Sequence, residues 1–193
     1  MKKLSRVMTV LLAGAVAAAC ANGSRPPTAP ESISVPVQFS TAAHAGADVP
    51  HNHRTHLTGA EEVPVRDTRA QGQAIFEISR DGSQVSYRLI ASNIENVTQA
   101  HIHCGPAGVN GPVVVWLYPN PSSTSAVAGA GRHDGVLATN TFNNSHVRPT
   151  TNPNCPGGVQ TLADVLDRIR SGNAYVNVHT TRFPPGEIRG QID

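Results

Sequence analysis

Apolar and polar side chains alternate along several short segments of the 193-residue chain. Residues 73–79 carry an apolar side chain at every second position, and residues 85–89 repeat the pattern. This period of two is typical of a half-buried β-strand. The pair Asp81-Gly82 lies between the two segments and is a strong signal for a hairpin turn. The pattern therefore predicts a β-hairpin over residues 72–92.

More strands are predicted downstream of this hairpin. In residues 98–104, Ala100 and Ile102 face one side of the strand, whereas His101 and His103 face the other. The same reasoning predicts three more strands, at residues 113–118, 174–179 and 187–192. The sequence therefore indicates a mainly β protein.

Between the strands, composition and periodicity predict one long loop and one helix. Residues 119–158 are dense in Pro, Ser, Asn and Gly, and only residues 135–142 suggest an element there. A short α-helix is predicted near residues 161–171, with Thr161 as its cap and Gly172 at its end. Its apolar residues follow a helical spacing and form one face: Leu162, Val165, Leu166 and Ile169.

Residues 1–20 are typical of a signal peptide. Basic residues at the start precede an uncharged, mostly apolar run of 13 residues. This run is too short to span a membrane, which takes roughly 20 residues. It ends in Ala-Ala-Ala-Cys20, which resembles a bacterial lipobox with Ala17 where Leu is usual. We expect Cys20 to carry lipid, and ordinary signal-peptidase cleavage is the alternative. Residues 21–54, rich in Pro, Ala and Ser, are predicted to form a flexible tether.

The number of cysteines predicts a disulfide, and the net charge limits the classes of binding partner. Three cysteines are an odd number for an exported chain. If Cys20 carries lipid, Cys104 and Cys155 remain, and we expect them to form a disulfide in an oxidising compartment. Without the signal peptide, 12 of the 15 Lys and Arg residues face 13 Asp and Glu, a net charge near −1. This charge argues against nucleic acid as a partner, and membrane contact is expected only through the N-terminal lipid.

Several motifs, in this order along the chain, resemble the CHRD domain, which is named after chordin. They are LTGAEEVP at 57–64, AHIH at 100–103, NGPV at 110–113, AYVNVHT at 174–180 and PGEIRGQI at 185–192. The resemblance implies a single antiparallel β-sandwich or barrel of immunoglobulin-like type over residues 55–193, and it implies no agreed biochemical activity. Cys104, Cys155 and the long polar stretch at 122–156 depart from the family's pattern.

The most distinctive chemistry lies in His101, His103 and His179. Residues i and i+2 of a strand share one face about 6.5–7 Å apart, and imidazoles suit copper or zinc. If the strand of His179 lies beside residues 98–104, three imidazoles can meet at one ion, which requires ligand atoms within about 4 Å of one another. The alternative is structural: His101 and His103 bond to backbone and hold the turn at 105–112. General acid–base catalysis is a third hypothesis.

Two other pairs of polar residues are candidates for a functional role. The pair His101-x-His103 is similar to a local pattern on a sandwich strand of the copper–zinc superoxide dismutases. The other metal ligands of those enzymes, a bridging His and a zinc-binding Asp, have no clear match in this sequence. His133-Asp134 is the nearest candidate pair for them. Glu187 and Arg189 share one face of the last predicted strand. We expect them to form ion pairs with strand neighbours, and a ligand-facing role or a buried network is the alternative.

The sequence contains no Gly-x-Ser-x-Gly, no phosphate loop and no dinucleotide fingerprint. No nucleophile with a local base stands out. The sequence therefore favours a non-enzymatic, lipid-anchored protein of the outer membrane or periplasm, whose β domain binds an unidentified protein or envelope ligand. A secreted protein is the alternative location. A copper- or zinc-binding protein, either a carrier or a dismutase-like enzyme, is the alternative function.

Overall fold

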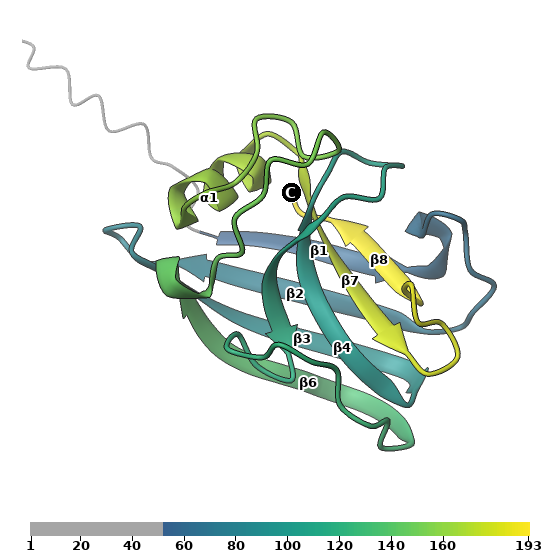
Figure 1. Ribbon diagram of the computed structural model, residues 1–193. Coiled ribbons are helices and arrows are strands. Elements are labelled where there is room, and N and C mark those ends of the chain that lie inside the picture. The colour runs from purple at the N-terminus through teal and green to yellow at the C-terminus, as the bar shows by residue number, and fades with distance from the viewer. Residues whose placement is uncertain (1–51) are drawn as a thin grey trace, which may run out of the picture. The chain divides into compact units, whose positions relative to one another are not determined.

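The computed structural model describes residues 52–193 (Figure 1). The predicted signal peptide, Cys20 and residues 21–51 of the predicted tether lie outside the described residues. The first strand, β1 (Asn52–Thr58), begins within the range expected for the tether.

The described residues form one antiparallel sheet of eight strands. After β1 they are β2 (Gln71–Ile78), β3 (Gln84–Glu95), β4 (Val97–Cys104), β5 (Val113–Tyr118), β6 (Arg132–Asn143), β7 (Ala174–Thr180) and β8 (Ile188–Gln191). Their order in the sheet is β5-β4-β7-β8-β1-β2-β3-β6. The sheet curls so that β4, β7 and β8 lie across β1, β2 and β3 (Figure 1). The predicted mainly β fold, a sandwich or barrel, is confirmed.

Two hydrogen bonds join opposite ends of the sheet order and nearly close it. The Tyr87 hydroxyl on β3 donates to the Leu117 carbonyl on β5 over 2.5 Å. The backbone N–H of Arg148, which follows β6, donates to the Val114 carbonyl of β5 over 2.8 Å. The curled sheet encloses the apolar core, because alternate residues of each strand point inward.

The helix and hairpin form where the sequence predicts them. The helix α1 (Leu162–Arg170) packs its four apolar residues into the core, and Thr161 caps it in a capping box with Asp164. The hairpin β2–β3 pairs as expected. Two short 3-10 helices, η1 (Gly59–Glu61) and η2 (Asn144–His146), complete the elements of the described chain. The described residues include no helix with the length and hydropathy needed to cross a membrane.

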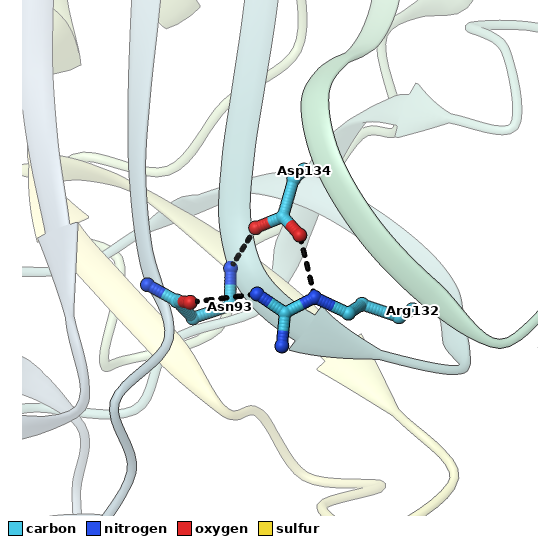
Figure 2. A network of polar contacts seen from close by, with 3 residues as sticks. All are labelled: Asn93, Arg132 and Asp134. Carbon is cyan, nitrogen blue, oxygen red and sulfur yellow. Dashed lines mark hydrogen bonds and ion pairs between the residues drawn. The ribbon is translucent and has the colours of Figure 1, made fainter.

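The predicted long loop contains a strand that is longer than expected. The element suggested at residues 135–142 is part of the 12-residue β6, which pairs with β3 through two register shifts. At one shift, Asp134 accepts hydrogen bonds from the Asn93 N–H (2.7 Å) and from Arg132 Nε (2.6 Å), and Arg132 also donates to the Asn93 side chain (Figure 2). This exposed network holds the bulge of β3 against β6.

The predicted disulfide between Cys104 and Cys155 is confirmed, and it joins residues 51 positions apart. Cys104 is the last residue of β4, and Cys155 lies in the loop before α1. Nearby, the Asn154 side chain donates to the Asn110 carbonyl over 2.9 Å. The disulfide and this bond hold the 152–158 loop next to residues 105–112, which follow β4.

Both faces of β7 are buried, which is unusual for a strand of an antiparallel sheet. Val176 and Val178 face the apolar core. The side chains of the other face are large and polar or aromatic: Tyr175, Asn177 and His179. Three segments cover that outer face. Glu62, directly after η1, contacts Asn177, and Gly111 of the 105–112 loop contacts Tyr175. Pro184 of the 181–187 loop contacts His179. The polar groups of the candidate site lie in this covered layer.

Candidate metal centre

The three histidines singled out in the sequence lie on neighbouring strands. β4 pairs with β7, so that His101 lies opposite Asn177, His103 opposite Tyr175, and Gln99 opposite His179. His179 is therefore a diagonal neighbour of His101 on the same face of the sheet. The predicted adjacency of the two motif-bearing strands is confirmed.

The three imidazoles converge on one point above the sheet. The His101 Nδ1 and His179 Nε2 atoms are 3.1 Å apart. The possible ligand atoms of all three residues lie within 4.8 Å of one another. One pair is therefore inside the 4 Å that a shared ion requires, and the full set is slightly wider than that.

Backbone carbonyls orient two of the three rings. His103 Nδ1 lies 2.9 Å from the Gly111 carbonyl, and His179 Nδ1 lies 2.8 Å from the Pro184 carbonyl. A carbonyl only accepts, so both Nδ1 atoms carry the proton. The Nε2 atom of each neutral ring then carries the lone pair that a cation would bind. Protein-bound metals commonly have this arrangement, in which the non-ligating nitrogen of each histidine donates to a carbonyl.

Two of the four remaining ring nitrogens bond to each other, and the other two are left without partners among the described residues. His179 Nε2 must accept, so His101 donates its Nδ1 proton to it. His101 Nε2 and His103 Nε2 are buried and have no hydrogen-bond partner among the described residues. Buried polar atoms of this kind are rare in folded proteins and call for an explanation.

Burial keeps the three rings neutral. It lowers the pKa of His101 to about 2, with smaller contributions from His179, His103 and Arg148. It lowers the pKa of His103 to about 4, against the opposing effect of the Gly111 hydrogen bond. Burial also lowers the pKa of His179. Neutral imidazole is the form that binds metals, so the site is ready for an ion at physiological pH.

The family comparison agrees with this architecture. A family model described as CHRD domain matches residues 53–192. The chain belongs to the CHRD-domain family. No curated protein matches the sequence.

The donor set of this CHRD domain fits copper or zinc. Three imidazole nitrogens are suitable ligands for both metals. Bonds of about 2 Å place two ligand nitrogens roughly 3.3–3.5 Å apart, close to the separation between His101 and His179. The third ring needs a shift of about 1 Å to complete the set. Within the described residues, this cluster contains neither carboxylate nor thiolate ligands.

His133 and Asp134 do not join the cluster. His133 Nε2 bonds to the Gly135 carbonyl, and Asp134 bonds to Asn93 and Arg132 (Figure 2). This pair was the nearest candidate for the other dismutase ligands, and in the structure it lies at the β3–β6 bulge instead.

Glu187 and Arg189 are both buried and make two separate sets of hydrogen bonds instead of the expected ion pairs. Glu187 accepts hydrogen bonds from the Thr68 and Thr180 hydroxyls, both at 2.7 Å. Arg189 is 1% exposed and donates to three groups of the 105–112 loop: the Pro106 carbonyl, the Val109 carbonyl and the Asn110 side chain. The expectation of ion pairs was wrong because Glu187 contacts two hydroxyls, and Arg189 contacts carbonyls and a side-chain amide of a loop.

Glu62 belongs to the same layer, although sequence reasoning did not single it out. Its carboxyl accepts a hydrogen bond from the Asn177 side chain over 2.5 Å, and Asn177 lies opposite His101. Burial raises the pKa of Glu62 to about 7, although Arg189 and Arg66 oppose the shift. Its position in the first CHRD motif, at 57–64, was the signal that could have identified it.

Proposed function

We propose that this CHRD domain is the binding module of an exported, lipid-anchored envelope protein, and that it holds a copper or zinc ion through His101, His103 and His179. The observation that carries the proposal is a group of three histidines whose ligand atoms lie within 4.8 Å of one another, in which His103 Nε2 is buried and lacks a partner among the described residues. A bound cation accounts for this lone pair, because a buried acceptor without a donor is destabilising by about 1–3 kcal/mol.

Binding is a better interpretation of this site than catalysis. His101 and His179 are 2% and 6% exposed, and His103 is half-buried. Metal catalysis needs a coordination position that a substrate can reach, and the burial of His101 and His179 restricts such access. The domain would therefore store, carry or be stabilised by its ion.

Metal analysis of the full-length protein tests the proposal. The chain is produced without an affinity tag, equilibrated with copper or zinc, desalted, and analysed by mass spectrometry for metal content. We expect one ion per chain, lost in His103→Ala and retained in His56→Ala. His56 is an exposed histidine of β1, outside the cluster, and serves as the matched control. Wild-type protein without stoichiometric metal would refute the proposal.

The lipid anchor is tested separately. The signal-like segment before Cys20 supports it, and a single lipid-bearing cysteine would attach the domain to a membrane surface. We expect wild-type protein in the membrane fraction and Cys20→Ala in the soluble fraction. If the variant stays with the membranes, the anchoring hypothesis is wrong.

A further inference from the structure

Two histidines of the cluster each contact an aromatic ring, and the guanidinium of an arginine lies over each of those rings. The His101 ring meets Trp116 edge-on, with centroids 4.3 Å apart, and Arg148 Cζ lies 5.4 Å from the Trp116 centroid. The His103 ring stacks on Tyr175, with centroids 4.9 Å apart. The cluster thus has a fixed cation on two sides, each one aromatic ring away.

On the Tyr175 side, Arg189 Cζ lies 3.4 Å from the centroid of the tyrosine ring. This guanidinium cannot turn away, because it is buried and donates to the Pro106 and Val109 carbonyls. On the other side, Arg148 donates to the Ser123 carbonyl. Both positive charges are therefore held by backbone acceptors.

No negative charge in the cluster balances these arginines. The metal-ligand group of the described chain consists of three neutral imidazoles. The buried carboxyl of Glu62 lies beside the cluster on Asn177. Because burial raises the pKa of Glu62 to about 7, its negative charge is only partly present at neutral pH.

We propose that the site selects a singly charged ion, Cu(I), over the doubly charged Zn(II) and Cu(II). This inference rests on the metal-binding function proposed above. The electrostatic cost of burying an ion rises with the square of its charge, so a divalent ion needs anionic ligands or solvent that a covered all-imidazole site does not supply. Repulsion from Arg148 and Arg189 is also twice as large for a divalent ion.

Coordination number favours the same ion. Zn(II) in protein sites is almost always four-coordinate, and the cluster offers three side-chain ligands among the described residues. Cu(I) accepts three neutral nitrogen donors. Three imidazoles anchored by carbonyls and stacked on aromatic rings therefore complete its shell without a further group.

The inference is tested by changing the charge of Arg148 and measuring two affinities. Full-length protein competes with bicinchoninate for Cu(I), kept reduced by ascorbate without oxygen, and with a chromophoric chelator for Zn(II). Arg148→Gln removes one positive charge. By Coulomb's law at about 10 Å and an effective dielectric constant of about 20, we expect a gain of about 15-fold for Cu(I) and about 250-fold for Zn(II). Arg148→Lys keeps the charge, and Arg88→Gln changes an exposed arginine of β3, so both should behave like wild type.

The outcomes separate this inference from the function on which it rests. Cu(I) retained by wild-type protein in the presence of equimolar Zn(II), together with the unequal gains in Arg148→Gln, would support selection by charge. Zn(II) displacing Cu(I) from wild-type protein, or equal changes for both ions, would overturn it and leave metal binding intact. Failure to bind either ion would refute metal binding itself. Circular dichroism of each variant identifies any that does not fold.

Discussion

The neutral histidines make the fold sensitive to acid in its metal-free form. In the unfolded chain a histidine has a pKa near 6.5, whereas burial lowers the pKa of His101 to about 2 and that of His103 to about 4. A lowered folded-state pKa means that the unfolded chain binds more protons. The stability that neutral histidines provide is therefore present above about pH 6.5 and is lost as the pH falls toward the folded-state values.

The size of the effect follows from these pKa values. Between pH 7 and pH 5, protonation of the unfolded chain at His101 and at His103 lowers the free energy of unfolding by about 2 kcal/mol each, or about 4 kcal/mol together. The lowered pKa of His179 adds to the loss. A loss of this size is a large part of the about 5–15 kcal/mol by which domains are typically stable.

Glu62 opposes this loss over the same pH range. Its pKa is raised from 4.5 to about 7, so its contribution is fully present below about pH 4.5 and is lost as the pH rises through 7. Between pH 7 and pH 5, protonation of folded Glu62 returns about 2 kcal/mol. The variant Glu62→Gln removes this opposing effect and should reveal the full histidine contribution.

Urea unfolding of the full-length protein at pH 7, 6 and 5, with a chelator present, measures the effect. The chain has one tryptophan, Trp116, and it is 8% exposed, so its fluorescence reports unfolding. In Glu62→Gln we expect the free energy of unfolding to fall by about 4 kcal/mol or more from pH 7 to pH 5. A flat or rising value in that variant would show that the folded histidines take up protons, and the argument for a neutral, buried cluster would fail.

Four further predictions concern the surroundings of the site. Glu62→Gln should raise the free energy of unfolding at pH 8 by about 2–3 kcal/mol in urea unfolding, because it removes a buried negative charge. Gly111→Ala should abolish metal binding in metal analysis, since its Cβ would lie 1.7 Å from the Cys104 carbonyl oxygen and displace the acceptor of His103. Gly108→Ala in the same loop has no atom near its Cβ; its φ of +76° should cost about 1–2 kcal/mol of stability, and the ion should be retained. Replacing Cys104 and Cys155 together by Ser should cost about 2–5 kcal/mol in urea unfolding. Metal at a hundred times its dissociation constant should raise unfolding free energy by about 2.7 kcal/mol, and an unchanged melting temperature would contradict specific binding to the folded state.

The sequence predicted those strands whose inward positions are apolar. In β2 the inward residues are Ala74, Phe76 and Ile78, and the hairpin was found. In β1 the buried residues are His53, Thr55 and Leu57. Two of these three are polar, so the alternation that defines a strand is absent from the hydropathy pattern. A strand of this kind becomes visible only through its pairing with β2 and β8.

The sequence predicted the three histidines of the candidate site, but it did not predict the groups that orient them. The i, i+2 spacing on one strand identified His101 and His103 as candidates, and a CHRD motif identified His179. The groups that orient the rings are the carbonyls of Gly111 and Pro184. Every residue has a backbone carbonyl. Which carbonyl faces a histidine therefore depends on the path of the loop and cannot be read from the residue types. The burial of Glu62 is hidden for a related reason, since a glutamate in a turn is usually exposed.

The structural and metal-binding interpretations of the histidines are compatible, because they use different atoms. The backbone bond expected for a structural histidine is present at His103, whereas His101 bonds to His179 instead. His179 makes a similar bond to the Pro184 carbonyl, and both backbone bonds occupy only Nδ1. A residue that merely holds a loop gains nothing from a second buried nitrogen without a partner, and such an atom is destabilising. The same Nδ1 bonds fix the tautomer and aim Nε2 at the cluster, which is what a metal ligand requires. The carbonyl bonds are therefore compatible with an ion at the facing nitrogens of His103 and His179.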